Sequence, residues 1–237
     1  MKISNKVIGN GNPLFFIAEA GVNHNGSIEI AKKLVDAASD AGADAVKFQT
    51  FKTENIATVS APKSTYHIKT TGSDKDMSWF DLLKTQELDK KMHIEIMDYC
   101  NHKNIIFLST PYDYESADLL DELGVPAYKT ASTDTNNIPF LKYLAKKGKP
   151  IIMSSAMCNM NEVVEAVESV RSEGVSEIAM LQCTGNYPAK IEDSNLNVIN
   201  EYFDKLNCIV GYSDHTIGLI NPVAATALGA CIYEKHI

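Results

Sequence analysis

The chain has 237 residues, of which 45% are hydrophobic and 22% are charged, and its formal net charge at pH 7 is −8. This composition is typical of a globular protein with a sizeable core, and it argues against a disordered or fibrous chain. The acidic balance also argues against a general nucleic-acid binder, which would carry a basic stripe.

The N-terminus and the cysteines favour a cytoplasmic protein without a membrane partner. The first residues, MKISNKVIGNGNP, lack the apolar core of a signal peptide, and no run approaches the roughly 18 to 20 apolar residues of a membrane span. The five cysteines are an odd number and form no C-x-x-C pair, so we expect buried, reduced thiols rather than a disulfide framework.

Eight short apolar runs alternate with helical patterns, a rhythm typical of parallel strands joined by crossover helices. The runs are LFFIAEAG at 14–21, AVKFQT at 45–50, IIFLSTP at 105–111, AYKTAS at 127–132, PIIMSSA at 150–156, IAMLQCTG at 178–185, CIVGYSD at 208–214 and CIYEKHI at 231–237. Their number favours an α/β fold of the (β/α)₈ TIM-barrel type, with an open doubly wound sheet as the main alternative. We predict a single domain over residues 1–237.

Two intervening helices can be placed from their end signals. We expect Ser27 to cap the first and Gly42 to end it, with a buried face of Ile30, Leu34, Ala37, Ala38 and Ala41. A later helix should follow Asn161 and end at Gly174, with a buried stripe of Val163, Val167 and Val170. The connection at 51–81 is far longer than most strand-to-helix loops, which predicts a lid or substrate wall, or else a surface excursion.

Polar residues gather at the carboxyl ends of almost all the predicted strands, where barrel enzymes build their sites. They are Glu19, Lys47, Gln49, Ser109, Thr110, Lys129, Ser132, Ser154, Ser155, and the residues at 182–187, 213–215 and 234–236.

The lysines in these runs indicate an anion site. A buried ammonium group needs an anionic partner, and Lys47, Lys129 and Lys235 all lie in strand-like runs. Glu19 or Glu234 is one such partner, and Lys235 is out of phase with Glu234, so it is expected to face outward. Together with the hydroxyls of Ser132, Ser154 and Ser213, the lysines are expected to form a binding site for phosphate or carboxylate.

Two histidines suggest a metal site. His215 and His236 belong to consecutive strands, whose backbones lie roughly 4.8 Å apart, so two imidazoles could share one divalent ion. Barrel closure would bring Glu19 beside them, and such a donor set suits Mn²⁺, Co²⁺, Fe²⁺ or Zn²⁺. The alternative is a pair of hydrogen-bonded structural histidines. Asp214 is expected either to orient His215 or to cap the following turn.

The remaining histidines carry weaker signals. His24, in AGVNHNG, is interpreted either as a substrate contact or as a loop-stabilising residue, since turn chemistry explains only its Asn and Gly neighbours. His67, His93 and His102 look like ordinary loop or helix-surface residues.

The combined motifs resemble the sialic acid synthase (nonulosonate synthase) family over almost the whole chain. They are FIAEAGVNHNGSIEIAKKLVDAASDAGADAVKFQT, IIFLSTPYDYESADLLDELGVPAYKTAS, KPIIMSSAM, LQCTGNYPA, VGYSDHTIG and EKH. The resemblance implies a transferase that condenses phosphoenolpyruvate with N-acetylmannosamine or a related amino sugar. C3 of phosphoenolpyruvate would attack C1 of the open-chain sugar, water would add at C2, and phosphate would leave by C–O cleavage.

The resemblance also implies roles for the site residues. A divalent metal ion, Mn²⁺ or alternatively Mg²⁺ or Co²⁺, would be held by His215 and His236. Glu19 would be an acid/base or water-orienting carboxylate with Glu234 nearby. The substrates would contact Lys47, Lys129, Gln49, Thr110, Ser132, Asp134, Ser154, Asn186, Tyr187 and Ser213.

Some features depart from the family pattern. Ser155-Ala156-Met157 replaces Ser-Gly-Met, and Asp134 stands where relatives often carry Glu, which leaves the acceptor sugar open. N-acetylmannosamine and the legionaminate precursor rank above the pseudaminate precursor.

The chain stops at Ile237, where family members continue through an eighth helix into a C-terminal antifreeze-like domain and form homodimers. We therefore expect a barrel truncated after strand eight, with metal and phosphoenolpyruvate affinity but little turnover. The alternatives are a metal-dependent aldolase or isomerase on the same barrel and an inactive ligand-binding module.

Overall fold

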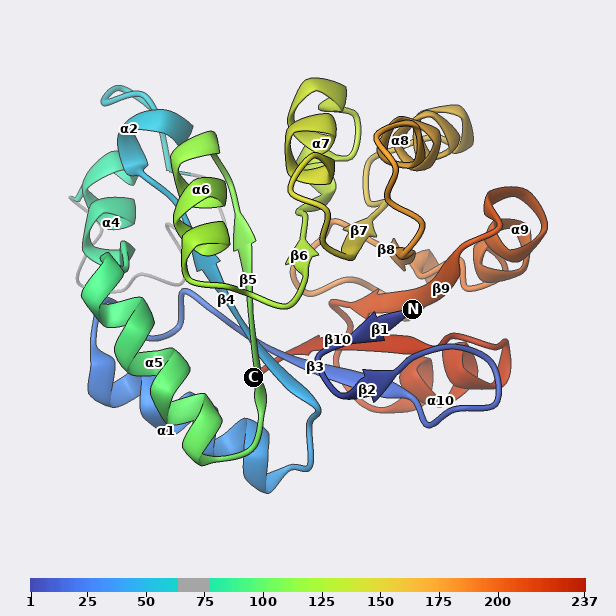
Figure 1. The fold of residues 1–237 in the computed structure, drawn as a ribbon, viewed down its shortest axis with the longest axis horizontal. Coiled ribbons are helices and arrows are strands. Elements are labelled where there is room, and N and C mark those ends of the chain that lie inside the picture. The colour runs from blue at the N-terminus through green and yellow to red at the C-terminus, as the bar shows by residue number, and fades with distance from the viewer. Residues whose placement is uncertain (64–76) are drawn as a thin grey trace.

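The computed structural model describes residues 1–63 and 77–237 and contains a parallel eight-stranded (β/α)₈ barrel (Figure 1). The sheet order is β5-β4-β3-β10-β9-β8-β7-β6, and β5 and β6 lie side by side, which brings the two ends of this order together. The strands are β3 (Phe15–Gly21), β4 (Ala45–Thr50), β5 (Ile106–Pro111), β6 (Tyr128–Lys129), β7 (Ile151–Ser154), β8 (Ile178–Cys183), β9 (Ile209–Asp214) and β10 (Ile232–His236). Each falls within a predicted run, so the barrel prediction is confirmed.

Helices follow the strands and surround the barrel. They are α1 (Ile28–Asp40), α2 (Thr53–Ile56), α4 (Trp79–Gln86), α5 (Lys90–His102), α6 (Tyr114–Glu122), α7 (Ile138–Ala145), α8 (Met160–Ser172), α9 (Val198–Leu206) and α10 (Ile220–Ala227), with short 3₁₀ turns η2 (Ser132–Asp134) and η3 (Ile191–Asp193). Across the two described ranges, none of them is long and apolar enough to cross a membrane. Of the predicted wall at 51–81, residues 64–76, including His67, lie outside the described residues.

The barrel interior is filled by a compact apolar cluster. Its members are Ile3, Ile8, Phe15, Ile17, Ala45, Leu108, Ala127, Ile152, Ala179, Leu181, Cys231 and Ile232. Ile3 and Ile8 come from the N-terminal hairpin of β1 (Lys2–Ile3) and β2 (Lys6–Val7), which lies in front of the barrel in Figure 1. The hairpin therefore closes the amino-terminal end of the barrel, and the opposite end stays available for polar side chains.

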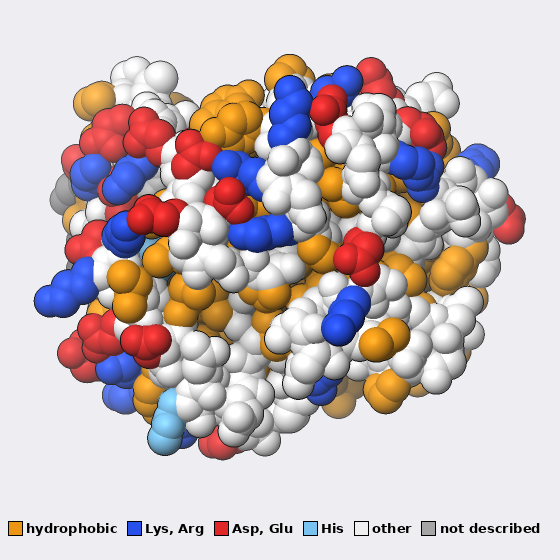
Figure 2. Space-filling view, in the orientation of Figure 1, with side chains coloured by type: hydrophobic (Ala, Val, Ile, Leu, Met, Phe, Trp, Pro, Cys, Tyr) orange, Lys and Arg blue, Asp and Glu red, His pale blue; other side chains and the backbone are white. Residues whose placement is uncertain are grey.

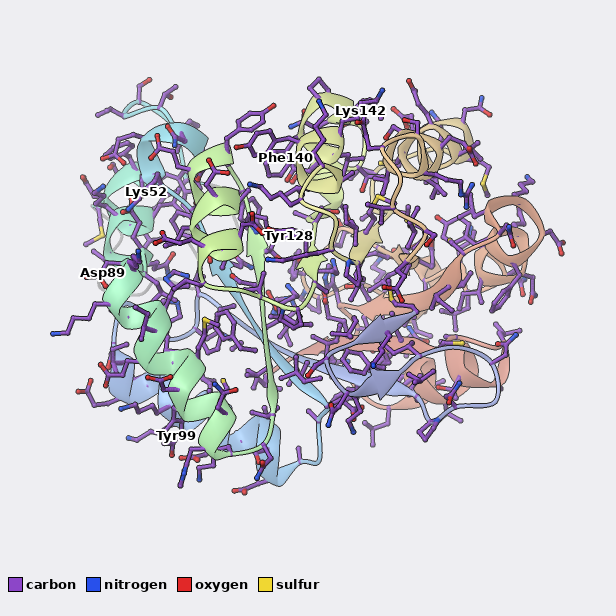
Figure 3. All side chains as sticks on the ribbon, viewed as in Figure 1. Lys52, Asp89, Tyr99, Tyr128, Phe140 and Lys142 are labelled. Carbon is purple, nitrogen blue, oxygen red and sulfur yellow. The ribbon has the colours of Figure 1, made fainter. Side chains whose placement is uncertain are left out.

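The opposite faces of the strands pack against the helices in a second, larger apolar layer. Tyr128 on β6 and Phe140 on α7 belong to this layer, and Figure 3 labels both near the junction of the two elements. On the face drawn in Figure 2, acidic and basic side chains are interspersed over the helices, and no basic stripe crosses this face.

The helix predictions needed two corrections. Ser27 caps α1 as expected, but the buried face is Ala31, Val35 and Ala38, and Ile30 is exposed. Helix α8 buries the predicted Val163, Val167 and Val170, but its cap is Asn159, which forms a capping box with Glu162, and not Asn161.

His93 also differs from the expectation of a surface residue, because it is fully buried on α5. Its Nδ1 lies 2.8 Å from the carbonyl oxygen of Asp89 and its Nε2 lies 2.8 Å from Oγ1 of Thr50. Thr50 Oγ1 in turn lies 2.7 Å from Oγ of Ser109, so this chain of polar groups ties α5 to β4 and β5. His102 is exposed at the end of α5, as predicted.

Candidate functional site

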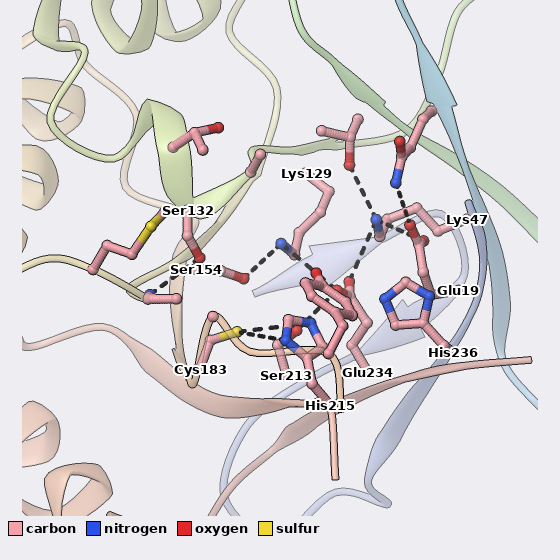
Figure 4. A pocket seen from close by; sticks show the side chains of 18 of the residues that line it. Glu19, Lys47, Lys129, Ser132, Ser154, Cys183, Ser213, His215, Glu234 and His236 are labelled. Atoms are coloured by element: carbon pink, nitrogen blue, oxygen red, sulfur yellow. Dashed lines mark hydrogen bonds and ion pairs between the residues drawn. The ribbon is translucent and has the colours of Figure 1, made fainter. Parts of the chain in front are cut away.

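The carboxyl ends of all eight strands converge on one polar cavity of about 270 Å³ (Figure 4). The lining residues are Glu19, Lys47, Gln49, Thr110, Tyr112, Lys129, Ala131, Ser132, Thr133, Ser154, Ala156, Met157, Cys183, Gly185, Tyr187, Ser213, His215, Glu234 and His236. Most of the predicted polar strand-end residues therefore meet in one place, but Ser109, Ser155 and Gln182 do not line the cavity. Ser109 faces Thr50 on the helix side of the sheet, and Ser155 donates to the carbonyl oxygen of Leu181.

The strand register places the charged residues at two adjacent levels, because Glu234 lies opposite Ile17, two residues before Glu19 on β3. Glu19 on β3 is the register partner of both Lys47 on β4 and His236 on β10, and Glu234 on β10 is the partner of Ser213 on β9. Because side chains alternate along a strand, Lys47 and Gln49 face the cavity together, as do Glu234 and His236.

Lys47 lies in a buried ion pair at one side of the cavity. Its Nζ is 2.6 Å from Oε2 of Glu19 and donates to Oγ1 of Thr110 at 3.0 Å. Gln49 Nε2 donates to the other oxygen of Glu19 at 3.1 Å. These bonds hold Lys47 and Glu19 in a fixed arrangement at the cavity wall.

Lys129 occupies the other side of the cavity, with Glu234 between the two lysines (Figure 4). Lys129 Nζ donates to Oγ of Ser154 at 2.6 Å and to the carbonyl oxygen of Thr130 at 2.9 Å. Its distance to Oε1 of Glu234 is 3.8 Å, and Lys47 Nζ lies 3.9 Å from Oε2 of the same carboxylate. Neither lysine therefore has a close ion pair with Glu234.

Burial and the neighbouring charges set the protonation of this cluster. Burial opposes ionisation of Glu234, but Lys129 and Lys47 outweigh it and lower the pKa of its carboxyl group. Burial raises the pKa of Glu19, against the opposing effect of Lys47, and the charge of Glu234 raises it further. The pKa of Lys129 is lowered by burial. Two carboxyl groups in one cavity thus have opposite tendencies, an arrangement seen where acid and base roles are divided.

The two predicted metal-binding histidines lie together beside this cluster. Their ring centroids are 5.4 Å apart, and burial lowers the pKa of both His215 and His236 to about 4. Both imidazoles are therefore neutral at pH 7, the form that binds metals. His215 Nδ1 lies 2.7 Å from the carbonyl oxygen of Thr184, which can only accept, so Nδ1 carries the proton and Nε2 keeps its lone pair.

This donor set is compatible with a divalent metal ion. Oε2 of Glu234 is buried without a hydrogen-bond donor, which leaves an oxygen available near the imidazoles. Within residues 1–63 and 77–237, no three or more His, Cys, Asp or Glu side chains are grouped so as to hold a metal. A metal at His215 and His236 would therefore complete its coordination with water or substrate.

Asp214 caps the following turn and does not contact His215 through its side chain. Its Oδ1 accepts from the backbone N–H and the hydroxyl of Thr216, and its Oδ2 accepts from Tyr233 and Lys235. The second of the two interpretations of Asp214 is therefore the correct one, and Thr184 takes the orienting role. Lys235 faces away from the cavity, as its phase predicted.

Other predicted residues lie outside the cavity wall. Asp134 is on η2, where it accepts a hydrogen bond from Asn137, and Asn186 is exposed on the β8–α9 segment; neither lines the cavity. His24 is fully buried, accepts the backbone N–H of Gly26 and lies beside Phe48, which favours the loop-stabilising role.

The structure adds cavity residues that were not predicted from the sequence, among them Tyr112 and Met157. Both line the wall together with Cys183 of the predicted strand end 182–187, whose thiol pKa burial raises to about 11. Tyr112 follows Thr110 by two positions, so strand alternation was a usable signal for it. Met157 has φ of 68°, a left-handed conformation that nothing in the sequence indicated.

The fold and the cavity define a (β/α)₈ barrel with a polar site of buried lysines, carboxylates and imidazoles at the carboxyl ends of its strands. The sequence pattern of the NeuB family matches residues 34–237. The chain therefore belongs to the NeuB family, which confirms the resemblance to sialic acid synthases.

Individual relatives agree with this assignment. The chain is 46% identical to N,N'-diacetyllegionaminic acid synthase of Campylobacter jejuni over 93% of its length, and 37% identical to N-acetylneuraminate-9-phosphate synthase of Mus musculus over 97%. It spans 66% and 63% of those two proteins. The crystal structure of N-acetylneuraminic acid synthetase from Leptospira borgpetersenii in complex with citrate matches all of this chain and 77% of its own, with TM-score 0.86 and 34% identity.

Proposed function

We propose that this chain is the barrel of a nonulosonic acid synthase, which condenses phosphoenolpyruvate with an amino sugar aldehyde and releases phosphate. The observation that carries the proposal is the presence of two buried ammonium groups, Lys47 and Lys129, in one cavity with two neutral imidazoles. The names of the longer relatives support the same reaction class.

The lysines and hydroxyls suit a substrate that carries both a phosphate and a carboxylate. Lys129 and Lys47 lie on opposite sides of Glu234, and each already donates to a hydroxyl, from Ser154 and Thr110 respectively. Charge-assisted hydrogen bonds from fixed donors bind oxyanions strongly because the donors are already desolvated and oriented. We assign these lysines to the two anionic groups of phosphoenolpyruvate.

The imidazoles and carboxyl groups complete the proposed chemistry. A divalent metal ion held by His215 and His236, with Mn²⁺ as our choice and Mg²⁺ or Co²⁺ as alternatives, would polarise the aldehyde oxygen of the sugar. Glu19, whose pKa is raised, lines the cavity and is positioned to exchange a proton with an oxygen atom of a bound substrate. Glu234, whose pKa is lowered by the two lysines, stays ionised and stabilises their charged ammonium forms.

The proposed reaction is balanced by one water molecule. A bond forms between C3 of phosphoenolpyruvate and C1 of the sugar, and water adds at C2. The C2–O bond to the phosphate then breaks, with the carbonyl of the product forming as inorganic phosphate leaves. The residues that face the cavity act mainly by holding the reactants in register and by fixed charge.

For the acceptor we propose the diacetamido sugar that precedes N,N'-diacetyllegionaminic acid. The chain is closer to the legionaminic acid synthase of C. jejuni, at 46% identity, than to the mouse neuraminate-9-phosphate synthase, at 37%. N-acetylmannosamine is the second candidate. Gln49 and Tyr187 at the cavity wall are the proposed sugar contacts.

Calorimetric titration with phosphoenolpyruvate tests the anion site before any turnover is required. Replacing Lys129 by methionine should weaken binding by at least about tenfold, since a hydrogen bond to a charged group contributes about 1.5 to 3 kcal/mol. Lys142→Met is the matched control, because Lys142 lies on α7 on the outside of the barrel (Figure 3).

Mass spectrometry then identifies the acceptor, with phosphoenolpyruvate, Mn²⁺ and each candidate sugar offered in turn. The product should equal the sum of both substrates and water minus phosphoric acid. A wild-type chain that does not bind phosphoenolpyruvate, or a Lys129→Met variant that binds it as well as wild type, would contradict the proposal.

A further inference from the structure

The segment at 184–189, between β8 and η3, holds His215 at three separate points. The Thr184 carbonyl oxygen accepts the proton on Nδ1 of His215 at 2.7 Å. The ring of Tyr187 is stacked on the imidazole, with 3.9 Å between centroids and 28° between planes. The backbone N–H of Ala189 donates to the carbonyl oxygen of His215 at 2.9 Å, which also pairs this segment with the residue after His215.

These three contacts restrain different degrees of freedom of His215. The bond from Ala189 fixes its backbone, the bond to Thr184 fixes which nitrogen carries the proton, and the stacked ring of Tyr187 fixes the plane of the imidazole. A hydrogen bond alone permits the imidazole to rock about the Nδ1 contact, and a flat aromatic neighbour opposes that motion. The stack is therefore the contact that sets where Nε2 points.

The other surroundings of His215 leave this task to Tyr187. Cys183 Sγ is 3.9 Å from each ring nitrogen, a distance of weak contact. Asp214, the adjacent acid, is engaged with Thr216, Tyr233 and Lys235 and gives His215 no bond.

Tyr187 also contacts the second histidine. Its ring meets the His236 ring edge to face, with centroids 5.4 Å apart and planes at 85°. One aromatic side chain thus contacts both imidazoles. Tyr187 is 49% exposed, so its ring reaches this position from the cavity rim and not from within the packed core.

We propose that Tyr187 is a positioning residue for the metal site: its ring, and not its hydroxyl, holds His215 so that Nε2 faces the same ion as His236. The inference rests on the proposed function, since it concerns the metal assigned there. It goes beyond that function because it gives Tyr187 a role that is present before any sugar binds.

The test is Mn²⁺ binding to the 237-residue chain without substrates. The electron paramagnetic resonance signal of free Mn²⁺ measures how much of the ion remains unbound. Tyr187→Ala should weaken binding by about tenfold or more, the usual effect of removing a group that orients a metal ligand. Tyr187→Phe keeps the ring and should bind within about twofold of wild type. Lys190→Ala is the matched control, because Lys190 is an exposed residue directly after this segment that does not line the cavity.

A second measurement does not depend on the metal. In the metal-free chain, long-range ¹H–¹⁵N spectra of the imidazoles should show His215 as a single Nδ1–H tautomer in wild type and Tyr187→Phe. Tyr187→Ala should keep the Nδ1–H tautomer that Thr184 fixes but show exchange-broadened His215 signals, because the ring that fixes the imidazole plane is gone.

The possible results separate the two proposals. If His215→Ala binds Mn²⁺ as wild type does, the assigned metal site is wrong, and the imidazole spectra still decide whether Tyr187 orients His215. If His215→Ala loses Mn²⁺ but Tyr187→Ala retains it, the positioning role is overturned and the metal site stands. A Tyr187→Phe variant as weak as Tyr187→Ala overturns it as well, because the hydroxyl would then be the active group.

Discussion

Replacing Lys47 by methionine tests whether the charges of the cavity are mutually dependent. Methionine fills much of the same volume but removes the ammonium group that lies 2.6 Å from Glu19 and 3.9 Å from Glu234. Both carboxyl groups are buried, and the only other ammonium near them is Lys129, 3.8 Å from Glu234, among the residues that the structure describes. Glu19 would thus be left as a buried carboxylate without a close cation.

The expected cost is large. Removing one partner of a buried ion pair destabilises a protein by about 3 to 5 kcal/mol, because the remaining charge has neither water nor a counter-ion. Changing both residues, as Lys47→Met with Glu19→Gln, removes both charges and should recover more than half of that loss. The loss of unfolding free energy in Lys47→Met should also become smaller as the pH falls. The folded pKa of Glu19 is raised, so its unpaired carboxyl group destabilises the fold least when it is protonated.

Urea denaturation at pH 7 and pH 5 measures these free energies of unfolding for the wild type, both single variants and the double variant. Lys6→Met is the control, since Lys6 pairs with Asp44 near the surface with its side chain 48% exposed, and its loss should be a small fraction of that of Lys47. A Lys47→Met variant within about 1 kcal/mol of wild type, or a double variant no more stable than the single one, would refute this account of the cluster.

Further predictions concern the barrel interior and the pH dependence of folding. A Cβ on Gly211 would lie 2.4 Å from the carbonyl oxygen of Ile232, so Gly211→Val should destabilise the protein by roughly 3 kcal/mol or more. A Cβ on Gly185 would lie no closer than 3.6 Å to any atom beyond its chain neighbours, so thermal unfolding should show Gly185→Ala close to wild type. Equal melting temperatures for the two variants would contradict this. Burial lowers the pKa of His24 to about 4 from 6.5, so its contribution to folding is complete above pH 6.5 and is lost as the pH falls towards 4. His24→Asn keeps a side-chain acceptor for Gly26 but does not titrate, so its free energy of unfolding should fall less steeply over that range; an unchanged slope in urea denaturation would argue against a buried neutral imidazole.

The strands and their inward faces could be predicted from the sequence because strand alternation leaves little freedom. Once Lys47 and Gln49 were assigned to one face, the position of Glu19 and Glu234 followed from barrel closure. The face of α1 was harder to predict. Ile30 begins one apolar stripe and Ala31 begins another, and both have helical spacing. The rotation of the helix on the sheet selects between them, and that rotation depends on packing that no local pattern encodes.

Other errors had signals that were available in the sequence. Asn159 lies three residues before Glu162, the spacing of a capping box, whereas Asn161 does not. His93 shares a helical face with Ile96 and Cys100, which predicts burial. The contact of Tyr187 with His215 had no such signal, because it depends on the path of a connecting segment and on the stacking of two side chains from different strand ends.

The inward-facing side chains of these strands change from apolar to charged within two residues, and this change explains why the pKa values of the site are shifted. Ile17 lies below Glu19, Ala45 below Lys47, and Ile232 below Glu234 on the same faces. The apolar members form a dry floor that is sealed from the other end by Ile3 and Ile8 of the hairpin. Water cannot reach the charged layer from below, so its charges must be balanced by one another or by a bound anion. The same packing that stabilises the barrel therefore accounts for the shifted pKa values of Glu19 and Lys129 in its upper layer.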